Sequence, residues 1–278
     1  MYNGVQIKEQ ATDEYKEGYS QGVIDSQTKK EIIKDIIEMK EEQTEFHKRL
    51  LDTYGSFYFN FYKRIKIEGQ FLFRFIYLCS FMNYDNYLSN GRRLLRESDL
   101  QDMLLLGKSE YYKTKDYLLG KDLISINAEG LISVNSKYCK KGKINKTKVV
   151  EVIRMFNNGI QELYQKALPR EHKKLAILLD ILPYINYKYN IICYNPTEEN
   201  IELIKPIKMP DLCEMLGYDR SNSSRIKKQL FSLRVSGEKV IGLWQVENVD
   251  ALLVNPRVYY KGGEEKGLDY LEAIFRLR

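Results

Sequence analysis

The segment 219–229 carries the side chains of this sequence that are best suited to binding a polar ligand. It reads Asp-Arg-Ser-Asn-Ser-Ser-Arg-Ile-Lys-Lys-Gln. Helical spacing places Ile226, Leu230 and Leu233 on one inward face. The donors and acceptors of the outward Arg, Lys, Asn and Gln side chains match guanine and adenine edges. The outward set is Asn222, Ser224, Arg225, Lys228 and Gln229.

The start of the same helix offers groups for a phosphate. Arg220 and Ser221 lie there, where a cation, hydroxyls and backbone N–H groups without helical partners suit an anion. A polar, capped surface helix without a ligand is the alternative interpretation of the whole segment.

A second segment, 109–119, has a weaker version of this pattern. Its candidate contacts to a groove or a phosphate are Ser109, Tyr112, Lys113 and Lys115. We expect Tyr111, Tyr117 and Leu118 to belong to the core. Glu110 and Asp116 reduce the positive field, so contacts to a protein remain an alternative for this segment.

Two further clusters are basic. The range 137–148 holds six lysines and no acid, and it includes Lys140, Lys141 and Lys143. Arg92 and Arg93 precede the first of the predicted short helices. Such side chains neutralise phosphates and make binding salt-dependent, although a solvated linker also explains the lysines.

The predicted elements that position these residues form two similar series. The first has a strand at 57–61, helices at 68–84, 98–106 and 109–119, and a hairpin of 123–126 with 131–134. The second has helices at 172–185, 209–216 and 221–233, and a hairpin of 240–246 with 251–254. Helix, helix, turn, helix and hairpin is the order of a winged helix.

Matching letters indicate a tandem duplication. Residues 81–84 (Phe-Met-Asn-Tyr) match 184–187 (Tyr-Ile-Asn-Tyr). The helix 99–104 (Asp-Leu-Gln-Asp-Met-Leu) matches 211–216 (Asp-Leu-Cys-Glu-Met-Leu). Val-Asn-Ser-Lys at 134–137 matches Val-Asn-Pro-Arg, which begins at residue 254. Three blocks in one order predict two copies of one structural unit.

We therefore predict a mainly α protein with small β-hairpins (α+β), in which two tandem winged-helix domains follow a charged N-terminal helix. The predicted parts are a charged amphipathic helical extension (1–55), winged-helix domain 1 (56–136), a lysine-rich linker (137–150), winged-helix domain 2 (151–263) and a C-terminal helix (264–278). The apolar stripe of the extension packs on the protein itself or forms a homodimer with a partner helix.

Charge and motifs exclude several classes of function. Net charge is +6, and residues 1–50 carry −3, so the body carries +9 and suits nucleic acid. No phosphate-binding loop, GxSxG, HExxH or His-x-His motif occurs, so we expect no enzyme, cofactor or metal. The four cysteines form no CxxC pair, and no apolar run approaches the ~18 residues of a membrane span.

The segment 253–262 (Leu-Val-Asn-Pro-Arg-Val-Tyr-Tyr-Lys-Gly) and the two predicted winged helices resemble plasmid and phage replication initiators of the low-GC Gram-positive type. The resemblance covers residues 57–263. It implies binding to repeated origin sequences of double-stranded DNA, opening or bending of the duplex, and recruitment of host replication proteins.

The main hypothesis is thus a sequence-specific replication initiator of a plasmid or phage, cytoplasmic and associated with the nucleoid. A transcriptional regulator of a mobile genetic element, repressor or activator, uses the same residues on an operator and is the alternative. A scaffold protein whose winged helices bind protein is a third hypothesis, which the basic body disfavours.

Overall fold

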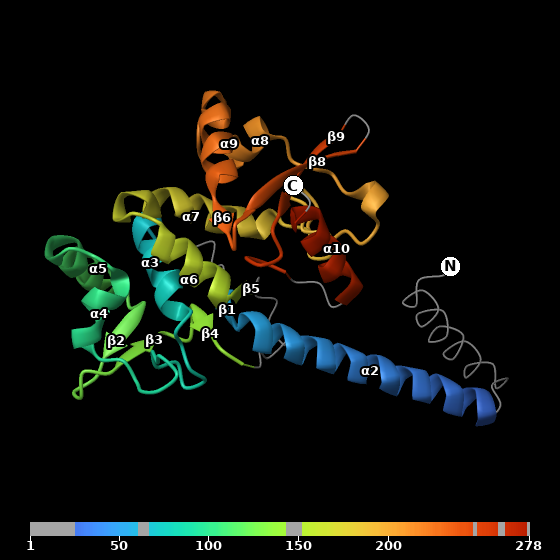
Figure 1. Cartoon of the computed structure of the whole chain (residues 1–278), viewed down its shortest axis with the longest axis horizontal. Helices are drawn as coiled ribbons and strands as arrows, with labels where there is room; N and C mark the ends of the chain where they lie inside the picture. The colour runs from blue at the N-terminus through green and yellow to red at the C-terminus, as the bar shows by residue number, and fades with distance from the viewer. Residues whose placement is uncertain (1–25, 61–66, 143–151, 247–248, 261–264, 277–278) are drawn as a thin grey trace. The chain divides into compact units, whose positions relative to one another are not determined.

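The computed structural model describes residues 26–60, 67–142, 152–246, 249–260 and 265–276. It divides the chain into one unit of residues 1–53 and a larger unit of residues 54–278. The charged helix α2 (Ser26–Tyr54) lies within the predicted helical extension of residues 1–55; residues 1–25 lie outside the described part. Helices and small antiparallel sheets make up the larger unit, so the predicted α+β class is confirmed (Figure 1).

The first half of the larger unit contains the predicted elements in the predicted order. They are β1 (Ser56–Asn60), α3 (Gly69–Cys79), α4 (Glu97–Leu104), α5 (Lys108–Gly120), β2 (Ile124–Ile126) and β3 (Ile132–Val134). Helix α3 ends at Cys79, before the predicted residue 84. The chain turns there because Asn83 Oδ1 accepts hydrogen bonds from the backbone N–H groups of Asp85 and Tyr87.

The second half repeats this order with additions. Its main elements are α7 (His172–Ile181), α8 (Met209–Met215), α9 (Ser223–Ser232), β8 (Ile241–Val246) and β9 (Val249–Val254). The short elements are η1 (Pro169–Glu171), η2 (Leu182–Tyr184), η3 (Ile201–Leu203), η4 (Arg220–Asn222), β6 (Arg234–Val235) and β7 (Glu238–Lys239). Helix α10 (Glu265–Arg276) follows near the predicted C-terminal position.

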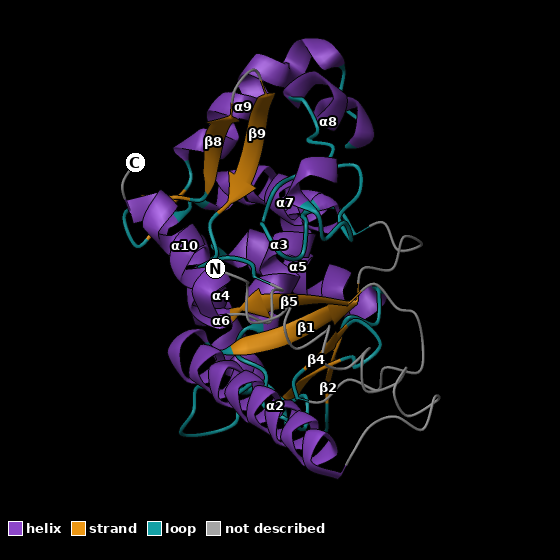
Figure 2. Cartoon of the chain, turned by 90° about the vertical axis from the view of Figure 1, so that its right-hand side faces the viewer, coloured by secondary structure: helices purple, strands orange, loops and turns teal. Residues whose placement is uncertain are grey.

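A three-stranded antiparallel sheet joins the two halves. In it, β1 lies between β4 (Cys139–Lys140) and β5 (Val152–Phe156), and α6 (Asn157–Lys166) continues directly from β5 (Figure 2). Neither β4, β5 nor α6 was predicted. Residues 137–150 were predicted as a linker, but Cys139–Lys140 is a strand of this sheet, and 143–150 lie outside the described residues.

One hydrophobic core serves both halves. Phe57 and Phe59 are two residues apart in β1, so they point to the same face of the strand, and both are buried there. Helix α3 packs directly against α7 and α6. The ring of Tyr77 in α3 stacks on the ring of Tyr164 in α6, with centroids 3.7 Å apart. The ranges predicted as two separate domains therefore share their interior.

The matched asparagines Asn83 and Asn186 make similar hydrogen bonds in the two halves. The backbone N–H of Asn83 donates to Tyr87 O at 2.8 Å, and that of Asn186 donates to Ile191 O at 2.7 Å. Both asparagine side chains accept from backbone N–H groups two residues further on. Each turn then places an asparagine at positive φ, Asn86 at 64° and Asn190 at 55°.

A second asparagine pair closes each hairpin. The amide nitrogen of Asn135 donates to Asp122 O at 2.8 Å, and that of Asn255 donates to Lys239 O at 3.0 Å. The two carboxamide oxygens accept from the N–H groups of Lys137 and Arg257. Two matched side chains, 120 residues apart in the sequence, thus fix two matched turns.

A buried guanidinium connects three helices of the shared core. Arg74 of α3 is 2% exposed. Its Nε donates to His172 Nδ1 of α7 at 3.2 Å, and its Nη1 donates to Thr114 Oγ1 at 2.7 Å and to Glu110 Oε2 at 3.0 Å, both in α5. These four residues form the Arg74 cluster. The bond to Nδ1 requires an unprotonated nitrogen, so His172 is held neutral.

Acidification therefore destabilises the fold through His172. Burial, together with the charge of Arg74, lowers the pKa of His172 to about 4. A depressed histidine pKa means that the unfolded chain binds the extra proton between about pH 6.5 and 4, so stability is full above this window and falls through it. We expect a loss of at most about 3 kcal/mol in unfolding free energy, measured by urea denaturation at pH 7 and pH 4.5.

The variant His172→Gln provides the comparison. Glutamine keeps an acceptor and does not titrate, so the pH slope should be flatter than in the wild type. Asp180, whose pKa burial raises to about 6, acts in the opposite sense between its ordinary value and pH 6. It is present in both proteins and cancels in the difference. Equal slopes in the two proteins would show that His172 does not carry the effect.

Candidate nucleic-acid interface

Helix α9 presents the polar face that its sequence predicts. Ile226 and Leu230 are buried, at 0% and 1% exposure, and Leu233 is half-buried. Ser224, Arg225 and Lys228 are exposed, whereas Asn222 and Gln229 are half-buried. The apolar spacing thus fixes which side of α9 faces the core, and the basic side chains lie on the other side.

The exposed face of α9 is positive and contains no acid. The sequence from residue 220 to 237 has five basic residues and no Asp or Glu. Arg225 and Lys228 form no salt bridge with any residue in the described part of the chain. Their charges are therefore available to an anionic ligand.

The start of this segment has partners within the chain. Arg220 forms salt bridges with Asp211 and Glu214 of α8, each at 2.8 Å. The Ser221 N–H donates to the Asp219 carboxylate at 2.8 Å. A phosphate at the predicted helix-start site would have to compete with these three carboxylates. The exposed cations of α9 without a salt bridge in the described part of the chain, Arg225 and Lys228, thus lie beyond Arg220, from the first turn of α9 onwards.

Most of the candidate cations of the first half are neutralised. Lys115 is bonded to Glu97 at 2.7 Å, with its ammonium 5.2 Å from the ring centroid of Tyr112. Lys113 lies 3.6 Å from Glu110. Ser109 and Tyr112 are exposed, and Tyr111 and Leu118 are buried, as expected.

Of the other basic candidates, some are paired or half-buried and others are exposed. Arg93 donates two hydrogen bonds of 2.7 Å to Asp99, which hold the pKa of that carboxyl at about 2. Arg92 is exposed. Lys140 is exposed at the end of β4, whereas Lys141 is half-buried with its ammonium 5.6 Å from the Tyr84 ring centroid. Lys143 lies outside the described residues.

Two basic residues near α9 were not predicted as part of the site. Lys227 is half-buried, with its ammonium 5.5 Å from the ring centroid of Phe231. Arg234 is exposed and donates to the carbonyl oxygens of Phe231 and Leu233 at the end of the helix. A basic residue just past a helix is a signal for such capping, and it was present in the sequence.

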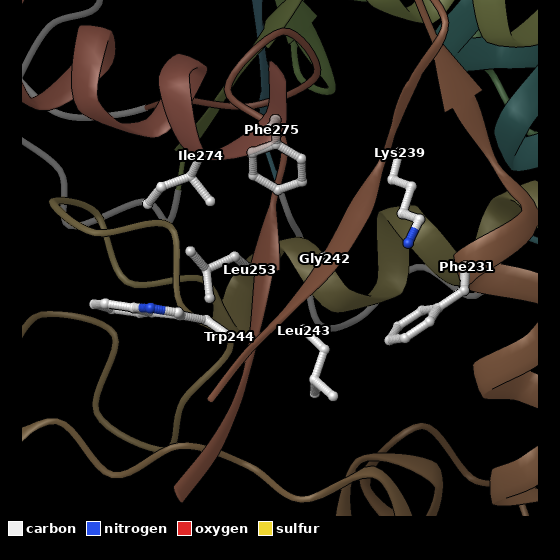
Figure 3. A pocket seen from close by; sticks show the side chains of 8 residues that line it. All are labelled: Phe231, Lys239, Gly242, Leu243, Trp244, Leu253, Ile274 and Phe275. Atoms are coloured by element: carbon white, nitrogen blue, oxygen red, sulfur yellow. The ribbon is translucent and has the colours of Figure 1, made fainter. Parts of the chain in front are cut away.

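A small apolar pocket of about 80 Å³ lies between the β8–β9 hairpin, the end of α9 and α10 (Figure 3). Its lining is Phe231, Lys239, Gly242, Leu243, Trp244, Leu253, Ile274 and Phe275. A Cβ on Gly242 would lie 3.2 Å from the Phe275 ring, so this glycine lets α10 approach the hairpin. Lys239 is the one charged lining residue, and the pocket therefore suits apolar packing rather than acid–base chemistry.

Neither a family model, nor a curated protein, nor a solved structure matches this chain. Within the described ranges, three or more potential metal ligands nowhere form a group, and no helix there is long and apolar enough to cross a membrane. The features of this chain that bear on function are the geometry and charge of α5, α9 and their flanking turns.

The turns that precede α5 and η4–α9 differ at one matched position. Gly217 follows α8 at φ 78°, a conformation that glycine adopts freely. Leu105 takes the same place after α4 at φ 51°, which costs a side-chain-bearing residue about 1–2 kcal/mol. Its side chain is 56% exposed. The packing of the Leu105 side chain therefore offsets little of the energy cost of its positive φ.

Substitution of Gly217 tests the conformational part of this comparison. No atom lies within 4 Å of a Cβ built at Gly217 or at Gly107, and only Gly217 has a positive φ. We expect Gly217→Ala to lower the unfolding free energy by about 1 kcal/mol, measured by urea denaturation. Gly107→Ala is the matched control and should cause no loss. Equal stability of the two variants would contradict the backbone argument.

Proposed function

We propose that this protein binds double-stranded DNA in a sequence-specific manner, with α9 in the major groove. The observation that carries the proposal is the acid-free, exposed face of α9, on which Arg225 and Lys228 have no anionic partner among the described residues. Arginine in the groove is the commonest specific partner of guanine, and lysine neutralises phosphates.

We further propose that each half of the larger unit is a winged helix. In each, a helix precedes a helix-turn-helix, and a hairpin follows it. Single bridges add a third segment to each hairpin, Tyr87 with Ser133 and Ile191 with Leu253. In such a fold the second helix of the pair lies in the groove, and this position belongs to α5 in the first half and α9 in the second.

The biological role that we propose is replication initiation at repeated origin sequences of a plasmid or phage, with host replication proteins as partners. Two halves on one core, whose second helices differ in charge, support recognition of an asymmetric site, and direct repeats consist of asymmetric sites. Transcriptional regulation by the same residues is the second candidate. It calls for a palindrome at a promoter, because operator symmetry mirrors a two-fold protein dimer.

Footprinting along the DNA that flanks the gene separates these roles. Protection of a repeat array beside an AT-rich stretch, weakened between about 50 and 200 mM salt as phosphate contacts require, supports initiation. One protected palindrome at a promoter supports regulation. No protection at low salt would remove the DNA-binding proposal and favour a scaffold role.

Arg225→Ala tests the base contact. We expect the loss of the guanidinium to weaken binding to the protected site by about 1–3 kcal/mol and to relax base preference at one position. Competition titration against single-base variants of the site measures both effects. Arg170→Ala is the matched control, because it removes one exposed arginine charge outside α9. If both variants lose the same affinity, Arg225 acts only through its charge.

Lys140→Ala tests the phosphate contacts separately. Lys140 is exposed at the end of β4 and would meet the backbone rather than base edges. We expect similar weakening on cognate and random DNA, and a salt slope that is smaller by about 1. A change confined to the cognate site would instead place Lys140 at a base.

A further inference from the structure

Leu105 combines backbone strain with an exposed apolar side chain. Its φ is 51°, and 56% of its surface is exposed, while the matched position of the second half is Gly217. The same turn is therefore made without strain elsewhere in this chain. Residues held in strained conformations are informative about function when the fold does not require them. The side chain of Leu105 is thus a candidate contact for something outside this chain.

Leu105 caps α4 in the turn that precedes α5, and α5 itself carries an exposed row. Tyr112 and Leu119 are one heptad apart and are 46% and 37% exposed. Lys108 and Asp116 lie four residues before and after Tyr112, on the same side of the helix, and both are exposed. Lys108, Tyr112, Asp116 and Leu119 form the α5 stripe, which is apolar at two positions and carries one charge of each sign.

The charge pattern of the α5 stripe is a poor match for DNA. Asp116 would face the phosphates, and the neighbouring cations Lys113 and Lys115 lie within salt-bridge distance of Glu110 and Glu97. Helix α9 carries no acid in the equivalent position. The two helices thus occupy corresponding places in their halves and present different chemistry.

We propose that the α5 stripe binds the α5 stripe of a second copy of this chain, with the two helices antiparallel. A two-fold axis at Tyr112 sets Lys108 opposite the partner's Asp116, and the antiparallel direction brings the turn that holds Leu105 to the end of the partner's helix that holds Leu119. Both contacts occur twice, as an interface with two-fold symmetry requires. The mixed charges that disfavour DNA are therefore self-complementary.

An interface of one helix and one turn per copy belongs to the small, reversible class of contacts. In solution the dimer therefore dissociates on dilution. A contact with two-fold symmetry relates copies that face opposite ways, so on DNA it would link two sites in inverted orientation and not neighbouring direct repeats. The solution contact itself does not depend on DNA, so it can be tested, and can fail, independently of DNA binding.

The test is sedimentation equilibrium of the full-length protein from about 1 to 100 μM, without DNA. The wild type should show a monomer–dimer equilibrium, and Leu105→Gly should raise the dissociation constant at least about tenfold. The same variant should melt about 2 °C or more above the wild-type Tm when both are monomeric, because glycine relieves the strain at positive φ. A misfolded variant cannot give a weaker dimer and a higher Tm together.

Leu203→Ser is the matched control, since Leu203 is 57% exposed and lies outside α5; its dissociation constant should equal that of the wild type. Lys108→Asp and Asp116→Lys should each weaken the dimer, and the double variant should restore it. A monomer at every concentration, a dimer that Leu105→Gly leaves unchanged, a dimer lost on replacing Ile33 and Ile37 of α2, or a double variant that stays weak would each overturn the proposal.

Discussion

The guanidinium of Arg74 is the interaction on which both halves of the larger unit depend. It lies in the interior without water to solvate it, so every hydrogen bond that it donates must be made inside the protein. Thr114 and Glu110 bind it from α5, and His172 binds it from α7. A shift of either helix would leave a buried charge short of partners. The cluster therefore holds the candidate DNA-binding helix of the first half in register with the first helix of the second.

The two halves agree at some positions around this core and differ at others. The asparagines that fix the turns, Asn83 with Asn186 and Asn135 with Asn255, make matched hydrogen bonds in both halves. The helices α5 and α9 occupy corresponding places and differ in charge. The turn geometry requires the asparagines, whereas the solvent-facing positions of α5 and α9 make few contacts within the chain that would fix their charge. The halves thus keep a common backbone and present different surfaces.

The sequence was informative where a local rule decides the structure. Spacing of Ile226 and Leu230 predicted the inward face of α9, and the turn at 127–130 predicted the hairpin β2–β3. The α+β class followed from the same local patterns. Strand β4 could not be predicted, because two residues, Cys139 and Lys140, are extended only through pairing with β1. Long-range contacts decided this element, and lysine-rich composition pointed to a linker.

In the candidate site, too, local sequence predicted the basic residues but not their partners from distant parts of the chain. Residue type predicted the cations Lys115, Arg93 and Arg220, but not that Glu97, Asp99 and the carboxylates of α8 would pair with them. Such partners come from elements that only the fold brings together. Sequence spacing does not tell which cations remain without a carboxylate partner. The difference in charge between the exposed faces of α5 and α9 therefore became visible only in the structure. The strain at Leu105 also has no sequence signature.

The pairing of β1 with β5 sets an order of events during synthesis. Ser56 pairs with Phe156, and Asn60 with Val152, so the first strand has to wait for a segment almost a hundred residues later. While the ribosome makes the intervening chain, β1 has neither of its neighbours in the finished sheet, since β4 also follows it. The first half therefore leaves the exit tunnel with both edges of β1 unpaired. Unpaired strand edges can pair with other chains, so this interval is the one in which β1 is open to wrong pairing.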